Sequence, residues 1–348
     1  MIQNLLNNSI LYTFAVFYKL RKVDTTNEYL GLKLKSPIIV GSCGLTSSVE
    51  DLLRIEQHGA GAVVLKSVFE EEIIHDIKRN THVTAPIEHY GESYEYIASH
   101  VADDSLARRF AVVKEATQRL SIPVIGSINC FSHENWLTYA KKFEECGCAA
   151  LELNMAILPY ESSLSAEDVE RTYTNIIQSL RLAVSIPISL KVGPYFTDMA
   201  KFMQRLSWLG IQGITMFNKS MQIDIDIDEM TMRSASCLSS HDVFYDTLRW
   251  VAILTNKLRC PISAVGGVYT PDDIIKLLLA GAGSVQVVSC LYKNGIEYLS
   301  TLNAGLKEWM SNKGYDNINQ FRGIMSVPTH DKASVAMRTQ FMRYFAEI

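Results

Sequence analysis

Eight short apolar runs recur along the chain and fall into two kinds. In four of them the second residue is proline, and the other four follow a glycine-containing turn. The two kinds alternate strictly along the chain. The proline-led runs begin at Ser36, Ile122, Ile186 and Cys260, and the glycine-led runs at Gly61, Gly147, Gly210 and Gly281. Each run is β-branched and nearly continuous in apolar character, which is typical of parallel strands buried on both faces.

The segments between these runs are long enough for helices, for example Val49 to Gln57 and Asp272 to Leu279. Eight strand–helix units with parallel strands predict an α/β fold, a closed (β/α)8 TIM barrel. In such barrels the active site forms at the carboxyl ends of the strands. The polar residues that end the runs are therefore the candidates for chemistry: Lys66, Asn129, Asn154, Lys191, Asn218, Gly266 with Gly267, and Ser289.

The pattern predicts one barrel with short additions at both ends. We expect an N-terminal extension over 1–27, a barrel over 28–325 and a helical tail over 326–348. Residues 28–36 alternate in polarity and predict a small hairpin strand that closes the bottom of the barrel. The apolar stretch from Ile10 to Tyr18 is too short for a membrane span, which takes about 20 residues. A short extra helix is the favoured interpretation of it, and a membrane-surface anchor is the alternative.

Two insertions interrupt the strand–helix rhythm. The first runs from Phe69 to about Asp104, before a helix predicted over Ala107–Leu120, and its histidines and tyrosines suggest a lid over the active-site mouth. The second follows Asn218, where isoleucine and aspartate alternate from Met221 to Met230. This period of two predicts an edge β-ribbon, because the glycine and terminal glutamate of a calcium loop are missing.

Composition narrows the possible partners. The chain is 48% hydrophobic and 20% charged with a formal charge of −4, which describes a soluble globular protein without the basic face that nucleic acid requires. Its seven cysteines are scattered without zinc spacing, so we expect reduced thiols, no bound metal and a cytoplasmic location. We expect a small-molecule substrate and no membrane span.

The Gly266-Gly267 pair ends the seventh run, and Thr270-Pro271 then predicts a helix start. Loops after the seventh and eighth strands commonly form a phosphate cradle in this fold. A tight turn is the alternative interpretation. Lys66 and Lys191 each end an apolar strand, where an amine beside the pyrimidine end of a flavin would stabilise the reduced anion. Either lysine could instead pair with a glutamate such as Glu152.

Several of these segments together resemble the dihydroorotate dehydrogenase family, specifically its class 1 branch, from about Tyr29 to Gly323. The segments are 36–44, 65–67, 151–154, 190–196, 217–218, 265–268 and 314–323. The resemblance implies an FMN-binding barrel that oxidises dihydroorotate to orotate in pyrimidine biosynthesis, and a possible homodimer. It implies flavin contacts from Ser42, Cys43 and Gly44, ring contacts from Lys66 and Ser67, a polar edge at Lys191 and Asn154, and phosphate contacts from Gly266, Gly267 and Ser289. Asn129 completes the predicted cofactor-binding set, because its amide ends a strand at the same mouth.

The chain departs from the family pattern where the substrate would bind. The position of the family's catalytic cysteine holds Ile157, and Pro159 stands in place of a substrate-binding asparagine. Asn218 is kept as a candidate substrate contact, but Lys219 replaces the serine that follows it. We hypothesise that Cys130 supplies the missing base, against the alternative of a packed thiol. The alternative functions are an FMN-binding barrel without this activity and a flavin enzyme with another substrate.

Overall fold

A computed structural model of the chain describes residues 23–72, 92–130, 132–155, 157, 163–219 and 222–328, with positions 338, 339, 342 and 346 beyond them. The side chains of 92–105 lie outside this description. Most of the predicted N-terminal extension and C-terminal tail also lies outside it, so those two boundaries stay predictions.

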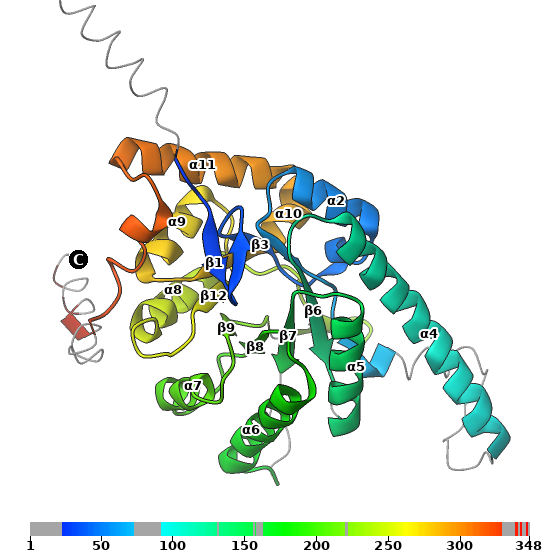
Figure 1. The fold of residues 1–348 in the computed structure, drawn as a ribbon. Coiled ribbons are helices and arrows are strands. Elements are labelled where there is room, and N and C mark those ends of the chain that lie inside the picture. Colours follow the sequence, from blue (N-terminus) through cyan, green and yellow to red (C-terminus); the bar gives the residue numbers. More distant parts are fainter. Residues whose placement is uncertain are drawn as a thin grey trace, which may run out of the picture.

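Eight parallel strands form a closed barrel, which confirms the predicted fold (Figure 1). The sheet runs in the order β4-β3-β13-β12-β9-β8-β7-β6-β5, and pairing of β4 with β6 closes it. The strands are β3 (Ile38–Val40), β4 (Ala62–Val64), β6 (Val124–Asn129), β7 (Ala150–Met155), β8 (Ile188–Val192), β9 (Gly213–Met216), β12 (Ile262–Val265) and β13 (Ser284–Val287). The short β5 (Val68–Phe69) continues the line of β4 along β6.

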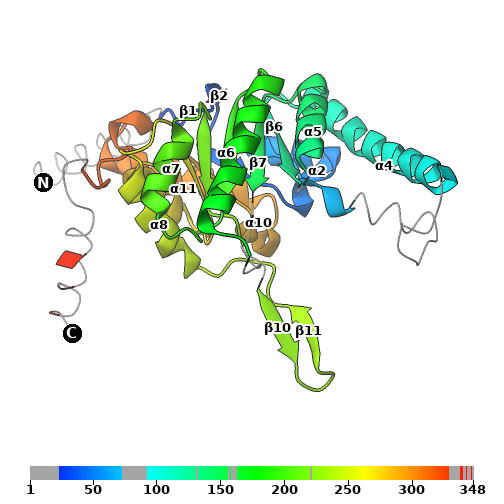
Figure 2. The same cartoon turned by 90° about the horizontal axis from the view of Figure 1, so that it is seen from below.

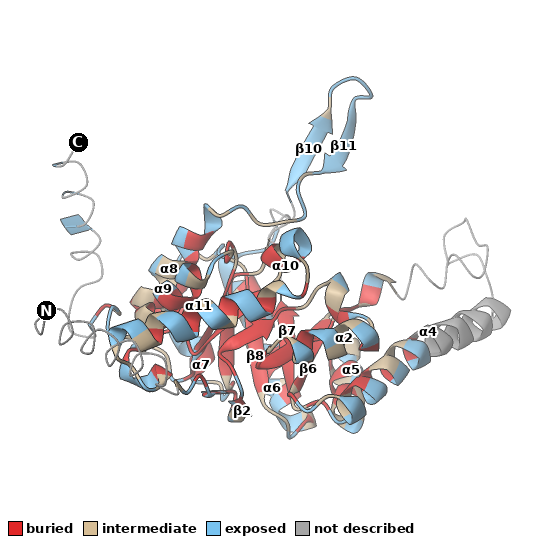
Figure 3. Cartoon of the chain, turned by 90° about the horizontal axis from the view of Figure 1, so that it is seen from above, coloured by how far each residue is buried: buried red, intermediate tan, exposed pale blue. Residues whose placement is uncertain are grey.

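Helices follow the strands and surround the barrel (Figure 1). They are α2 (Val49–Gln57), α4 (Glu92–Arg119), α5 (His133–Glu145), α6 (Ala166–Ala183), α7 (Met199–Ser207), α8 (Val243–Leu254), α9 (Pro271–Ala280), α10 (Ser289–Asn294) and α11 (Tyr298–Lys313), with short 3₁₀ turns η1 (Gly44–Thr46) and η3 (Ile318–Gln320). Buried strands inside a ring of half-exposed helices give the layered burial pattern of Figure 3. The helix predicted at Val49 to Gln57 is confirmed with the same bounds.

An N-terminal hairpin closes the bottom of the barrel, as predicted. It consists of β1 (Asn27–Tyr29) and β2 (Leu32–Leu34), and its buried side chains pack on residues of β3, β4, β6 and β7. Tyr29 reaches furthest, because its hydroxyl lies 3.0 Å from Ser189 Oγ inside the barrel. We call this hairpin, residues 27–34, the plug.

The two insertions differ in how well the sequence predicts them. The second forms the expected ribbon, β10 (Ile223–Asp226) paired with β11 (Thr231–Ser234), which projects from the barrel (Figure 2). The first prediction needs a correction, because α4 begins at Glu92 and not near Ala107. No glycine or proline occurs between Glu92 and Arg119, so nothing in the sequence interrupts a helix there. The remainder of the predicted lid, 73–91, lies outside the described residues.

Two further findings, on membrane spans and on metal sites, apply to the described residues. Within the described ranges, every helix is too short or too polar to cross a lipid bilayer. Among the same residues, no group of three histidine, cysteine or acidic side chains converges as a metal site would require. The aspartates of the ribbon face Arg233, which contacts Asp224 at 3.1 Å and Asp226 at 3.4 Å.

Candidate active site at the barrel mouth

Asn154 and Lys191 lie beside each other near the carboxyl ends of two neighbouring strands. They are register partners of β7 and β8, so their side chains project from the same face of the sheet. Both are buried, and Asn154 Oδ1 has no hydrogen-bond partner among the described residues. A buried acceptor without a partner is uncommon in folded proteins and indicates a place where a ligand donor could bind.

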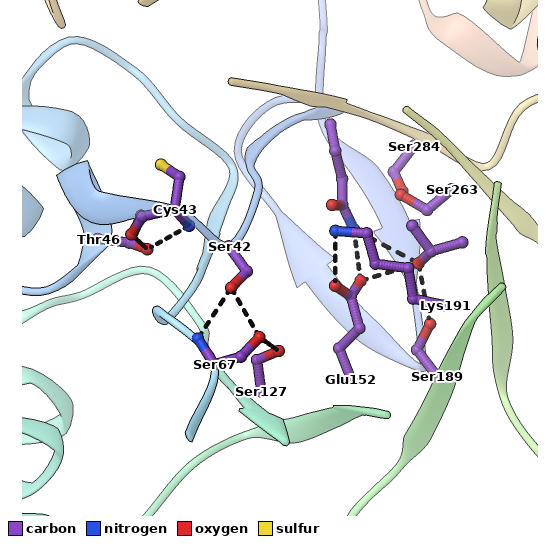
Figure 4. A network of polar contacts seen from close by, with 12 residues as sticks. Ser42, Cys43, Thr46, Ser67, Ser127, Glu152, Ser189, Lys191, Ser263 and Ser284 are labelled. Carbon is purple, nitrogen blue, oxygen red and sulfur yellow. Dashed lines mark hydrogen bonds and ion pairs between the residues drawn. The ribbon is translucent and has the colours of Figure 1, made fainter. Parts of the chain in front are cut away.

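Glu152 lies two residues before Asn154, on the same face of β7, and forms the centre of a buried polar cluster (Figure 4). Its Oε2 accepts hydrogen bonds from Thr215 Oγ1 at 2.9 Å and from Gln286 Nε2 at 2.6 Å. Its Oε1 lies 3.6 Å from Lys191 Nζ. Since β7 and β13 are not adjacent in the sheet, the bond between Glu152 and Gln286 crosses the barrel interior. The alternative partner considered for Lys191 is therefore present.

A chain of hydroxyl groups lies next to this cluster (Figure 4). Ser42 Oγ accepts from the backbone N–H of Ser67 at 3.0 Å, and Ser67 Oγ lies 2.7 Å from Ser127 Oγ. Ser127 is the register partner of Glu152, so the two groups share the barrel interior. The structure thus brings together two of the predicted flavin contacts, Ser42 and Ser67.

The residues beside Ser42 form the first turn after β3. Cys43 precedes η1, where its N–H donates to Thr46 Oγ1 at 3.2 Å, and burial raises the pKa of its thiol. Gly44 begins η1 at a point where a Cβ would lie only 2.8 Å from the Tyr292 hydroxyl. Both predicted contacts therefore lie in a close-packed turn at the mouth.

Lys66 follows β4 but does not join the Lys191 cluster. Its ammonium contacts Glu72 at 2.9 Å, and Arg109 contacts the same carboxylate at 2.7 Å. Burial alone would raise the pKa of Glu72, but hydrogen bonds from Lys66 and Arg109 outweigh it and hold that pKa below its usual value. Asn129, the last residue of β6, lies beside Phe69 in register.

The turn after β12 has the backbone form that the glycine pair predicts. Gly266 and Gly267 have φ angles of 110° and 68°, which residues other than glycine rarely adopt. The next helix, α9, begins as expected, with Thr270 as N-cap and Pro271 in its first turn. Asp273 holds this junction, because its Oδ2 accepts from the N–H groups of Tyr269 and Thr270, each at 2.9 Å.

A cavity of about 660 Å³ opens beside β9 and β12. Asn218 and Gly266, one from each predicted half of the site, both line it, together with Lys219. Lys219 Nζ donates to the carbonyl oxygens of Ser236 and Leu238, the latter at 2.8 Å. Its amine therefore holds the segment after the ribbon over the cavity.

Ser289 is the first residue of α10 and lies under the same segment. Its hydroxyl oxygen accepts from the backbone N–H of Ser239 at 3.0 Å, and the Tyr269 hydroxyl donates to the Ser239 carbonyl. The turns after β12 and β13 are thus joined through one short stretch of chain. The phosphate cradle at these turns stays a prediction.

Comparison with known proteins decides the family. The sequence matches the family profile described as dihydroorotate dehydrogenase over residues 25–310. The chain belongs to the dihydroorotate dehydrogenase family. It is 24% identical over 306 residues to the catalytic subunit of dihydroorotate dehydrogenase B (NAD(+)) of Thermoplasma acidophilum, covering 86% of this chain and 98% of that protein.

Two further relatives of the family extend the comparison. The corresponding subunit of Methanothermobacter thermautotrophicus is 26% identical over 303 residues, covering 84% of this chain and 95% of that protein. The NAD-dependent dihydropyrimidine dehydrogenase subunit PreA of Escherichia coli is 22% identical over 332 residues, covering 88% and 79%. Proteins that are named after two different reactions are therefore both similar to this chain.

Two of the predicted departures from the family pattern, Ile157 and Pro159, follow β7, and they stay predictions. Ile157 packs against the hydrophobic core, whereas Pro159 lies outside the described residues. Cys130, the hypothesised base, follows β6 and is half-buried. Its burial, and after that the charges of Glu70 and Glu71, raise its pKa well above the usual range. This environment disfavours the thiolate, so a catalytic role for Cys130 stays a prediction.

Sequence reasoning missed Gln286 and Thr215, which hold Glu152. A pattern that could have found them is present, because apolar residues alternate with polar or small ones in the runs 284–287 and 213–216. Every position of both runs is buried. Gln286 and Thr215 belong to a barrel interior that is polar at its centre.

Proposed function

We propose that this chain is an FMN-dependent oxidoreductase that oxidises a CH–CH bond beside a carbonyl group, with dihydroorotate as the first substrate to test. The observation that carries the proposal is the pair Asn154 and Lys191. The pyrimidine edge of a flavin presents one N–H donor between carbonyl acceptors. An unpartnered amide oxygen beside an ammonium offers the complementary acceptor and donors.

The remaining predicted contacts also suit FMN. Gly266, Gly267 and Ser289 would hold its phosphate through main-chain amides and a hydroxyl, since both turns face one stretch of chain. Ser42, Cys43, Gly44, Lys66, Ser67 and Asn129 would surround the ring and ribityl chain. The bound flavin would supply the hydride acceptor, while the protein orients the substrate against it.

Flavin binding is tested by purifying the full chain and titrating the apoprotein with FMN. We expect a yellow protein with a resolved flavin spectrum. Asn154→Ala is expected to weaken FMN binding because it removes the acceptor. A protein that stays colourless and shows no affinity for FMN overturns the proposal.

A second candidate is an FMN-binding barrel that acts on another substrate or on none. Two features favour it: the Ile157 side chain packs against the core and cannot take a proton, and burial raises the pKa of the Cys130 thiol. Anaerobic titration separates the two. Bleaching of the flavin by dihydroorotate supports the first proposal, whereas a yellow protein that dihydroorotate leaves oxidised supports the second.

We further propose a cytoplasmic homodimer, on the resemblance stated above. Light scattering of the FMN-loaded protein tests the oligomeric state. A monomer at micromolar concentration would contradict it.

A further inference from the structure

Lys191 has one carboxylate partner within the described residues, and that partner is Glu152. The side chains of Lys191 and Glu152 are 8% and 2% exposed, and their charged atoms lie 3.6 Å apart. Removing a charge from water costs several kcal/mol, so an ammonium in a barrel interior persists only beside an opposite charge. Glu152 therefore supplies the opposite charge beside the buried Lys191 amine.

The carboxylate of Glu152 is itself fixed in one orientation. Thr215 from β9 and Gln286 from β13 both donate to its Oε2, at 2.9 Å and 2.6 Å. These bonds occupy one oxygen and leave Oε1, which has no hydrogen-bond partner among the described atoms, directed at Lys191. Figure 4 shows dashed contacts converging on the Glu152 carboxylate, with Lys191 beside it. Strands from three parts of the barrel thus determine where the negative charge lies.

We propose that Glu152 is a positioning residue, which holds the Lys191 amine in place and directs it toward the cofactor edge that Asn154 also faces. This inference rests on the proposed function, because it assigns Lys191 a charge that acts on a bound flavin. Glu152 lies deeper in the barrel than Asn154 and acts through Lys191. Its effect on the flavin should therefore vanish when the amine is absent.

A double-mutant cycle tests this dependence. The variants are Glu152→Gln, Lys191→Met and the two combined, with Ser263→Ala as matched control, since Ser263 is equally buried in the interior and contacts Ser284 instead. Each full-length protein is measured as FMN-loaded protein for its flavin midpoint potential, and as apoprotein for its melting temperature. Glu152→Asp serves as the conservative rescue.

We expect Glu152→Gln to lower the midpoint potential, because the buried amine without its partner is no longer held against the flavin edge and stabilises the reduced anion less. In the Lys191→Met background the same change should leave the potential unaltered. The apoprotein of Glu152→Gln should melt roughly 6 °C or more below wild type, and much of that loss should disappear in the double variant. Glu152→Asp and Ser263→Ala should stay close to wild type in potential.

Several results would overturn the inference. A potential that rises in Glu152→Gln means that the Lys191 amine keeps its place without Glu152. Equal shifts in both backgrounds mean that Glu152 acts independently of the amine. If Glu152→Gln does not fold, folding of the double variant supports the pairing, and failure of both contradicts it. A wild-type protein that binds no FMN overturns the proposed function itself, whereas a yellow wild type with additive effects overturns the positioning role alone.

Discussion

Replacing Asp273 would test how the turn after β12 is held. This carboxylate is 1% exposed and accepts from the N–H groups of Tyr269 and Thr270 and from His241 Nε2 at 3.0 Å. Deleting a hydrogen bond to a charged group costs about 1.5–3 kcal/mol, and losing a helix cap costs about 0.5–2 kcal/mol. Because these contacts share one carboxylate, their costs overlap, and we expect Asp273→Ala to lose about 3 kcal/mol.

Thermal unfolding followed by circular dichroism measures this loss. For a chain of this length we expect about 2 °C per kcal/mol, so Asp273→Ala should melt roughly 6 °C below wild type. The control is Asp272→Ala, since Asp272 is exposed in the same helix turn and contributes only about 0.3–1 kcal/mol through the helix dipole. Equal melting of Asp273→Ala and wild type would refute the role assigned to this carboxylate.

The same residue predicts a dependence on pH. Burial alone would raise the pKa of Asp273, but hydrogen bonds from His241, Tyr269 and Thr270 outweigh it and hold the pKa below its usual value. Its stabilising contribution is therefore complete above the unfolded value of about 3.9 and disappears as pH falls through the lower folded value. The difference in melting temperature between wild type and Asp273→Asn should shrink in that acid range. A difference that grows in acid would contradict this.

Three further changes have distinct outcomes. Gly213→Ala places a carbon 2.6 Å from plug side chains and should lower the unfolding free energy, measured in thermal melts, by about 1–3 kcal/mol. The control Gly193→Ala meets nothing closer than 3.4 Å and should cost little. Equal losses in the two variants would refute the plug contact. Ser67→Ala deprives the buried Ser127 hydroxyl of a partner and should lower the unfolding free energy by about 1 kcal/mol in urea, and an unchanged midpoint would count against that bond. If Cys130 is the base, the rate of flavin reduction should rise with pH throughout the alkaline range, since the pKa of the thiol is raised. The reduction should also be lost in Cys130→Ser. A rate that does not change with pH would exclude this role.

The barrel could be predicted from local patterns because each strand and helix carries its own local cues. The apolar runs mark the strands, and Thr270-Pro271 marks the start of α9, where the structure places both the cap and the proline. The glycine pair indicates a turn with positive φ, which Gly266 and Gly267 adopt. These features depend on residues that are close together in the sequence, so local sequence patterns are enough to predict them.

The arrangement of the candidate site could not be predicted in the same way. Glu152 and Gln286 are 134 positions apart and meet across the barrel, a contact that no local pattern specifies. The runs are nearly continuous in apolar character, and this masks the alternate polar residues whose side chains lie in the barrel interior. Lys66 ends its strand as expected, yet its amine contacts Glu72, because the direction of a long side chain depends on the packing around it.

The plug ties the earliest residues of the barrel to its latest ones, which has a consequence for the order of folding. Asn27 donates to the Gly283 carbonyl, 256 positions later, and β3 pairs with β13 to complete the cylinder. The plug and β3 therefore complete their contacts only when Gly283 and β13 have been made. Until then the Asn27 amide and one edge of β3 lack these partners, so slow maturation is expected during synthesis.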